Sequence, residues 1–165
     1  MATTEQIKEL REITGAGILD CKRALEEVEG DITRAMEILR QRGLAKAEKK
    51  AKREVRQGLV EAYIHTRGRI GALVEVNCET DFVAQTDELK ELAHNLAMQV
   101  AATDPLSIGN DDLSEEVDPS QVCLLHQPFI KDPEKTVQDI VTETIAKVGE
   151  NIRVRRFARF ELAKE

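Results

Sequence analysis

The stretch Asn77-Cys78-Glu79-Thr80-Asp81-Phe82-Val83-Ala84 joins two different hydrophobic patterns. Before it, apolar residues alternate with other residues over 70–76, which predicts a β-strand. After it, apolar residues recur at helical spacing over 89–100. A corner between a strand and a helix holds its side chains on a rigid base, so it is a suitable place for a contact residue.

Phe82 is the large side chain at this corner, in a chain with four phenylalanines, one tyrosine and no tryptophan. If one helix runs unbroken from Asp81, Phe82 is in phase with Leu89 and belongs to the core. If instead Thr86 caps the next helix, residues 81–84 form a separate turn and Phe82 can contact a partner. The spacing alone leaves both interpretations open.

Composition and charge limit the possible classes of protein. The 165 residues are 41% hydrophobic and 33% charged, which is typical of a folded domain. With 24 Lys and Arg against 31 Asp and Glu, the net charge of −7 argues against binding to nucleic acid, whose phosphates require excess positive charge. No apolar run approaches the roughly 20 residues of a membrane span, and no leader pattern precedes the first helix. The three cysteines form no C-x-x-C pair, so we expect reduced thiols and a cytoplasmic protein without membrane contact.

Residues 1–43 are predicted to form a bundle of three short helices. Thr3 and Gln6 fit a capping box at its start, and glycines interrupt the helical pattern at 14–17. Gly43 is expected to end the third helix.

Ile18 and Leu19 follow the glycine turn and precede the second helical stripe. Two neighbouring residues cannot both point to one side of a helix, so at least one of them is expected to be exposed. An exposed apolar pair beside a flexible turn is a candidate contact with a partner. The alternative is that both residues help to close the bundle.

Residues 44–57 are predicted to be a basic helical linker. Six basic and two acidic residues give the segment a charge of +4, and its Ala, Lys and Glu content favours a helix with a solvated face. A ribosome- or RNA-associated module that uses residues 46–56 is the alternative function. No aromatic residue is interleaved there for stacking on bases, which is why the linker is preferred.

Residues 58–165 are predicted to be an α+β domain in which helices cover an antiparallel three-stranded sheet. Residues 58–77 are expected to form a β-hairpin with its turn at 66–69, and a third strand is expected at 152–162. Each strand has one apolar face that needs a covering layer, which the helix predicted over 87–102 can supply. The apolar strand positions are Val60, Ala62, Ile64, Ile70, Ala72, Val74, Val76, Ile152, Val154, Ala158, Phe160 and Leu162.

Three further features complete the predicted domain. Arg156 is the one charge on the apolar side of the last strand, so the strand is expected to bend or bulge there. Asp132 and Pro133 are expected to begin a helix that ends at Gly149. Residues 104–126 are acidic and lack periodicity, which predicts a solvated connection.

Motifs for enzymatic chemistry are absent from the sequence. It contains no phosphate-binding loop, dinucleotide fingerprint or zinc spacing, and its three histidines, His65, His94 and His126, stand apart from one another. We therefore expect no catalytic residue, no metal site and no cofactor, and a binding protein is the preferred class.

Four motifs span nearly the whole chain. They are Leu10-Arg11-Glu12-Ile13-Thr14-Gly15-Ala16-Gly17-Ile18-Leu19-Asp20-Cys21-Lys22-Arg23-Ala24-Leu25, Glu75-Val76-Asn77-Cys78-Glu79-Thr80-Asp81-Phe82-Val83-Ala84, Gln127-Pro128-Phe129, and Gly149-Glu150-Asn151-Ile152 with Arg155-Arg156-Phe157. In this order they resemble the elongation factor Ts family. The resemblance implies a translation elongation factor and guanine-nucleotide exchange factor that binds elongation factor Tu, displaces Mg²⁺ and GDP, and allows GTP to reload. It also implies that the N-terminal bundle resembles ubiquitin-associated domains and that the α+β domain serves dimerisation.

The resemblance further implies site residues and an oligomeric state. The residues implied to intrude near the nucleotide and magnesium site of elongation factor Tu are Thr80, Asp81, Phe82 and Val83. Those implied to contact the partner's G domain are Arg11, Ile18 and Leu19. This chain has one copy of the motif set, whereas long family members have two related halves, so a homodimer is expected. Family members also usually carry a helical stretch before the Gln-Pro-Phe motif, where this chain has its acidic connection.

Overall fold

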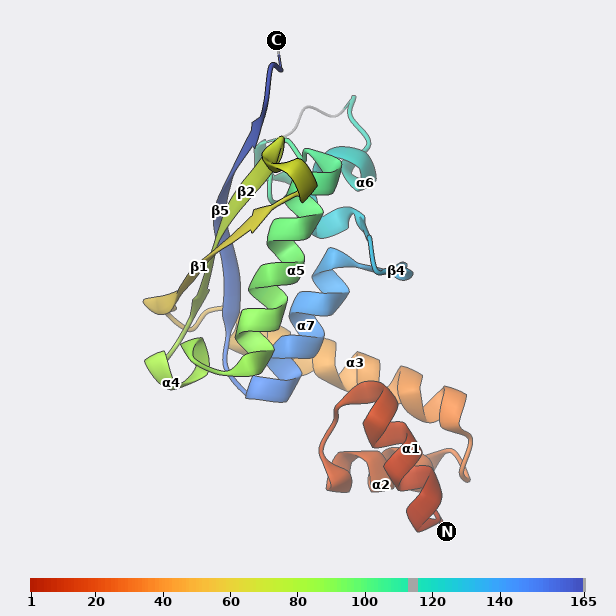
Figure 1. The fold of residues 1–165 in the computed structure, drawn as a ribbon. Coiled ribbons are helices and arrows are strands. Elements are labelled where there is room, and N and C mark those ends of the chain that lie inside the picture. Colours follow the sequence, from red (N-terminus) through yellow and green to blue (C-terminus); the bar gives the residue numbers. More distant parts are fainter. Residues whose placement is uncertain (113–115, 165) are drawn as a thin grey trace.

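The computed structural model describes residues 1–112 and 116–164. Its helices are α1 (Thr4–Thr14), α2 (Ile18–Glu27), α3 (Ile32–Lys50), α4 (Asp81–Ala84), α5 (Asp87–Thr103), α6 (Pro119–Val122) and α7 (Val137–Val148). Its strands are β1 (Gln57–Ile64), β2 (Ile70–Cys78), β3 (Pro128–Phe129), β4 (Asp132–Thr136) and β5 (Ile152–Glu161). The three N-terminal helices and the helix-covered sheet lie side by side (Figure 1), which confirms the predicted α+β class.

The N-terminal helices α1, α2 and α3 enclose a small core of their own. The predicted capping box is present, since the Thr3 hydroxyl accepts from the backbone N–H of Gln6 at 3.2 Å and the Gln6 side chain accepts from the N–H of Thr3 at 3.0 Å. Gly15 ends α1 in the left-handed conformation, with φ of 67°, which a residue with a Cβ adopts at a cost. The buried apolar residues of this core are Leu10, Cys21, Ala24, Leu25, Ala35 and Leu39.

The prediction that Gly43 ends the third helix is wrong, because α3 continues to Lys50. The residues after Gly43 are mostly strong helix formers, and their preference offsets the roughly 1 kcal/mol that one glycine costs inside a helix. Gly43 is buried where α3 passes α7, and a Cβ built on it would lie 3.9 Å from the Cβ of Ala146. The helical part of the predicted linker is therefore the end of α3, and residues 51–56 are not helical.

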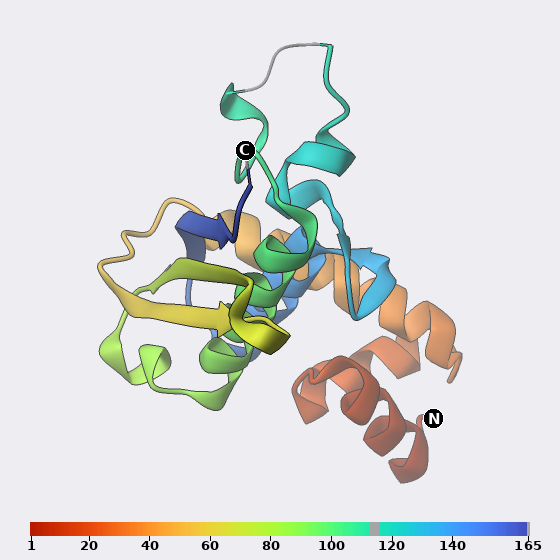
Figure 2. The same ribbon diagram turned by 45° about the horizontal axis from the view of Figure 1, so that its top comes forward.

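The sheet has the strand order β1-β2-β5, and both pairs are antiparallel. Helices α5 and α7 cover one of its faces (Figures 1 and 2). The main core lies between these layers and includes Val74, Val76, Cys78, Leu89, Leu92, Leu96, Val100, Val137, Val141 and Ile145. The predicted hairpin and third strand are confirmed.

The side chains of β1 do not face the helices in the predicted way. Val60, Ala62 and Ile64 point to the uncovered side of the sheet, whereas Leu59 and Tyr63 pack against the core. Hydrophobic residues occur on both faces of this strand, and the polar tip of Tyr63 reaches water at the edge of the sheet, where its hydroxyl contacts the Nδ1 of His65 at 2.9 Å.

A bulge in β5 exchanges the two faces of that strand. Val76 pairs with Val154 and Glu75 pairs with Arg156, so Arg155 is the extra residue between them. The predicted irregularity is confirmed, but its consequence was not foreseen. Beyond the bulge, Phe157 packs against the core while Ala158 and Phe160 lie on the uncovered face, opposite to the expectation.

The segments before α7 also differ from expectation. Residues Asp132–Thr136 form strand β4, and α7 begins after Thr136, whose hydroxyl accepts from the N–H of Asp139 at 3.2 Å. The predicted helix start at Asp132 and Pro133 is therefore wrong, because a capping box four residues later defines the end of the helix. The connection 104–126 contains helix α6 and two 3₁₀ turns, with Cys123 and Leu124 buried; its residues 113–115 lie outside the described part.

Candidate functional site

The segment between β2 and α5 forms a separate turn, called here the corner (residues 79–84). Thr86 caps α5 through its hydroxyl, which accepts from the N–H of Leu89 at 3.3 Å, so the helical pattern does not extend back to Phe82. Phe82 lies on the four-residue helix α4, and its side chain is 82% exposed. Of the two interpretations left open by spacing, the structure therefore selects the exposed ring.

The four predicted corner residues divide into two kinds. Asp81 and Phe82 project into solvent, whereas Val83 is buried in the main core. The hydroxyl of Thr80 accepts from the N–H of Val83 at 3.4 Å and caps the turn. Two residues therefore hold the corner in place, and two are presented by it.

Two carboxylates at one end of the sheet, where the end of β2 lies beside the start of β5, connect the corner to the loop that follows α7. The carboxylate of Glu150 accepts from the backbone N–H groups of Glu79 and Thr80, each at 3.0 Å, and from the Thr80 hydroxyl at 2.6 Å. In return, Glu79 Oε1 accepts from the backbone N–H of Asn151 at 2.7 Å. Sequence reasoning did not identify these acids as supports of the corner, because their partners lie about 70 residues away.

Cys78 is buried immediately before the corner. Its thiol donates to the carbonyl of Thr80 at 3.1 Å. Burial, with a smaller contribution from the negative charge of Glu150, raises the pKa of the Cys78 thiol to about 11. The thiol is therefore protonated near neutral pH and belongs to the support of the corner rather than to a reactive site.

The N-terminal pair is exposed on the first turn of α2. Ile18 and Leu19 are 56% and 68% exposed, while Cys21, one turn later on the same helix, is buried. The expectation that at least one residue of the pair is exposed is confirmed, and both are. Arg11 is exposed near the end of α1.

The corner and the N-terminal helices lie toward the same end of the molecule. In Figures 1 and 2, α4 is at the lower left of the covered sheet and α1–α3 are at its lower right. The hairpin turn Thr66–Gly68 lies at the opposite end of β1 and β2. The two predicted contact regions are thus presented from one end, with the ends of α5 and α7 between them.

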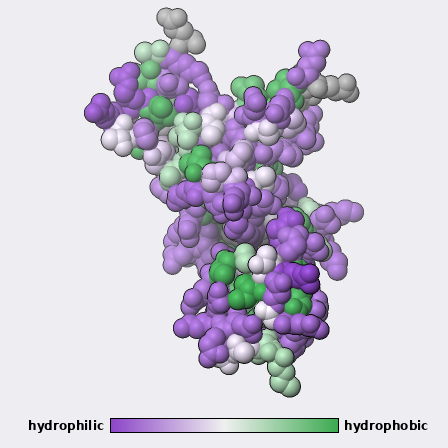
Figure 3. Space-filling model, turned by 90° about the vertical axis from the view of Figure 1, so that its right-hand side faces the viewer, coloured by the Kyte–Doolittle hydropathy of each residue, from purple (hydrophilic) through white to green (hydrophobic). Residues whose placement is uncertain are grey.

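A groove of about 350 Å³ separates the N-terminal helices from α7. Ile13, Met36 and Ala146 are among the residues that line it, and Arg40 and Asp139 approach to 4.0 Å across it. Apolar patches are visible within the polar surface of the N-terminal helices in Figure 3. None of the predicted site residues lines this groove, so the structure does not place those contacts there.

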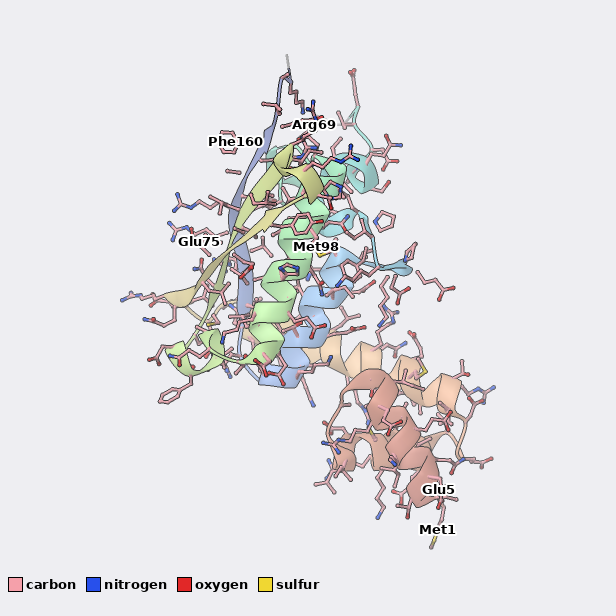
Figure 4. All side chains as sticks on the ribbon, in the orientation of Figure 1. Met1, Glu5, Arg69, Glu75, Met98 and Phe160 are labelled. Atoms are coloured by element: carbon pink, nitrogen blue, oxygen red, sulfur yellow. The ribbon has the colours of Figure 1, made fainter. Side chains whose placement is uncertain are left out.

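The uncovered side of the sheet is a second exposed surface, called here the open face. Figure 4 shows Phe160 and Glu75 on this side, away from α5. Its exposed apolar residues are Val60, Ala62, Ile64, Leu73, Ala158 and Phe160. Sequence reasoning assigned most of these to the covered face, although the presence of apolar residues in both phases of β1 and β5 was an available signal.

Residues 1–112 and 116–164 contain neither a metal-binding cluster nor a membrane-spanning helix. No three or more His, Cys, Asp or Glu side chains converge there in a way that would hold a metal ion. Within the same ranges, every helix is too short or too polar to serve as a membrane span. His94 approaches Glu61 to 3.5 Å, and the Nδ1 of His65 lies 2.9 Å from the Tyr63 hydroxyl.

The fold and the corner indicate the class of protein. It is an α+β protein that presents exposed apolar side chains from a rigid part of its backbone, as proteins that act by binding do. The family model described as Elongation factor TS matches residues 2–119. Elongation factor Ts of Carboxydothermus hydrogenoformans is 51% identical over 196 aligned residues, which cover 99% of this chain and 90% of that relative. Elongation factor Ts of Thermotoga neapolitana is 50% identical, and the alignment covers 96% of this chain and 96% of that relative. Elongation factor Ts of Heliobacterium modesticaldum is 47% identical, and the alignment covers 99% of this chain and 91% of that relative. The chain therefore belongs to the elongation factor Ts family and is a translation elongation factor.

The alignment also indicates a difference in length. It extends over 196 residues with Carboxydothermus hydrogenoformans, whereas this chain has 165, so that relative contains at least one segment that this chain lacks.

Proposed function

We propose that this protein is a guanine-nucleotide exchange factor for elongation factor Tu and that it acts by binding rather than as an enzyme. Membership of the elongation factor Ts family supports the proposal. The observation that carries it is the exposed ring of Phe82 on a corner that hydrogen bonds at Glu79, Thr80 and Val83 hold in place. An aromatic side chain in water gains free energy when it enters a partner's apolar site, which makes it suitable for a wedge.

Exchange then follows from the difference in affinity between two states of the partner. A GTPase holds GDP through Mg²⁺ and through backbone N–H groups around the phosphates. In this proposal, Phe82 enters between two elements behind that site and Asp81 perturbs the magnesium shell. The factor binds the distorted, empty state more tightly than the nucleotide-bound state, and by linkage it lowers the affinity for nucleotide by the same factor.

The N-terminal pair supplies a second contact in this proposal. Ile18 and Leu19 would bind the G domain of elongation factor Tu with Arg11 beside them, so residues 1–43 act as a partner-binding module. The location of α4 and α1–α3 at one end of the molecule supports simultaneous contact with a single partner (Figure 1). Residues 58–165 would carry the corner and the dimer surface.

We further propose a homodimer formed through the open face. An uncovered sheet face with exposed Val60, Ile64, Leu73 and Phe160 is more apolar than a solvated surface needs to be. A second copy presents the same face, and two sheets can pack face to face about a two-fold axis. The proposed location is the cytoplasm, where the partner acts, and no cofactor or nucleic acid is required.

Three of the six cations in the basic segment lie in ion pairs within the protein, which counts against the RNA-binding alternative. Lys46 lies 3.1 Å from Asp20, and Arg53 lies 3.6 Å from Glu79. Arg56 pairs with Glu54 at 2.9 Å. Cations that are paired within the protein attract phosphates less strongly than free ones.

The proposal is tested by release of fluorescent GDP from elongation factor Tu in stopped flow. The wild-type chain should accelerate release, and Phe82→Ala should reduce the acceleration while its thermal melting stays unchanged. Leu106→Ala, which removes another exposed apolar side chain far from the corner, is the matched control. No acceleration by the wild-type chain, or equal acceleration by Phe82→Ala, would refute the proposal in its present form.

A further inference from the structure

Glu150 makes more contacts with the corner than its place in the sequence suggests. It lies after α7, yet its carboxylate accepts three hydrogen bonds from Glu79 and Thr80, with lengths of 3.0, 3.0 and 2.6 Å. Hydrogen bonds to a carboxylate are stronger than those between neutral groups. The three bonds fix the backbone at the point where the chain leaves β2 and turns toward α4.

The Thr80 hydroxyl transmits this constraint into the turn that carries Phe82. A hydroxyl has one hydrogen to donate and lone pairs with which to accept. Because Thr80 donates that hydrogen to Glu150, its oxygen is oriented to accept from the N–H of Val83 at 3.4 Å. Glu150, Thr80 and Val83 thus form a chain of hydrogen bonds on the side of the turn opposite the solvent, with Phe82 presented on the other side.

The same loop also binds the segment that follows α3. The side chain of Asn151, which is buried, donates to the carbonyl of Arg53 at 2.9 Å, and its backbone N–H donates to Glu79 at 2.7 Å. The guanidinium of Arg53 lies 3.6 Å from the same Glu79 oxygen. The corner is therefore held relative to the segment that leads to the N-terminal helices.

We propose that Glu150 is a positioning residue for nucleotide exchange. Its carboxylate keeps the corner in the conformation that presents Asp81 and Phe82, and it does so without contacting the partner. This inference rests on the proposed function of the corner. It adds that the exchange activity depends on a carboxylate about 70 residues away in the sequence.

The test combines single variants with a mutant cycle in the GDP-release assay. Glu150→Ala should lower the release rate at saturating factor by on the order of ten-fold, as expected for loss of a charge-assisted hydrogen bond. Glu150→Gln should restore part of the rate, because its amide oxygen can still accept from the backbone. Glu143→Ala is the matched control, because it removes a carboxylate on α7 that lies seven residues before Glu150 and forms a 2.8 Å ion pair with Lys135. This variant should leave the release rate unchanged.

The mutant cycle separates positioning from direct contact. In a chain that already carries Asp81→Ala and Phe82→Ala, adding Glu150→Ala should change the rate by less than about two-fold, because coupled residues are not additive. Fully additive effects would overturn the positioning role, since Glu150 would then act on the partner by itself. A normal rate for Glu150→Ala, with a slow rate for Phe82→Ala, would overturn it too. If Phe82→Ala were normal, the proposed function of the corner would fail first.

Amide hydrogen exchange distinguishes local loosening of the corner from destabilisation of the whole domain. In Glu150→Ala or Glu150→Gln, the amides of Glu79 and Thr80 should exchange faster, while that of Val74 in the centre of β2 should be unchanged. Uniformly faster exchange throughout the sheet would overturn the proposal, because Glu150 would then stabilise the whole domain rather than the corner.

Discussion

Replacing Leu73 by glutamate should convert the proposed homodimer into folded monomers. Leu73 lies on the middle strand of the sheet, where its register partners are Ala62 on β1 and Ala158 on β5. The side chain is 46% exposed on the open face, so a glutamate at this position can direct its carboxylate into water in the monomer. In a face-to-face dimer, the same carboxylate would be buried against the second sheet.

The size of the effect follows from burial and symmetry. Complete burial of a leucine is worth about 1.5–3 kcal/mol, so covering the exposed 46% of Leu73 contributes roughly 1 kcal/mol per chain. Burying a carboxylate without a partner costs several kcal/mol more. A two-fold interface contains the substitution twice, so the dimer should lose on the order of 6 kcal/mol or more. That loss corresponds to a dissociation constant about 10⁴-fold weaker.

Sedimentation velocity at micromolar concentration measures this effect directly. The wild-type chain should sediment as a dimer and Leu73→Glu as a monomer, with circular dichroism showing an unchanged fold. Leu106→Glu places the same charge on an exposed leucine outside the sheet and should remain dimeric. A wild-type chain that is monomeric at this concentration, or a Leu73→Glu chain that is still dimeric, would show that the open face is not the interface.

Other predictions concern the N-terminal pair, the strand pairing and the buried thiol. Ile18→Ala and Leu19→Ala should each weaken binding to nucleotide-free elongation factor Tu by about 1–2 kcal/mol, or 5–30-fold, in calorimetry; unchanged affinity would exclude that contact. Gly58→Ala should destabilise the fold by about 3 kcal/mol or more, since φ is +148° and the new Cβ would lie 2.1 Å from the carbonyl oxygen of Val76; a melting temperature equal to that of wild type would contradict this. Cys78, with its pKa raised to about 11, should react with thiol reagents at about pH 8 far more slowly in the folded than in the unfolded chain. Because folding disfavours its thiolate, stability should fall as the pH rises from the ordinary value of 9.0 toward 11; equal labelling of both states would refute the assignment.

Local signals in the sequence located most elements correctly. The caps at Thr3 and Thr86 act within three residues of themselves, and both are present in the structure. A hydrogen bond between a side chain and a backbone group one turn away depends little on the rest of the fold. Because Thr86 caps α5, that helix begins at Asp87 and does not include Phe82, which therefore lies outside the helical stripe that faces the core.

Competing local signals explain two incorrect boundaries. Gly43 and Asp132 both carry ordinary signs of a helix end, yet α3 continues through the first and β4 begins at the second. At Gly43, the strong helix formers that follow and the close passage of α7 outweigh the glycine. At Asp132, the pairing of β4 with β3 and the capping box at Thr136 outweigh the proline.

The amino-acid order alone was sufficient for the class of fold and for the caps at Thr3 and Thr86, because these depend on patterns within a few residues. It was not sufficient for the direction of side chains beyond the bulge in β5, since one extra residue exchanges the two faces of a strand. Nor could it indicate that Glu150 supports Thr80, because only packing of the complete chain brings together groups 70 residues apart. The open face and the support of Phe82 are therefore properties of the folded chain, in which burial and long-range hydrogen bonds select among alternatives that local patterns leave equal.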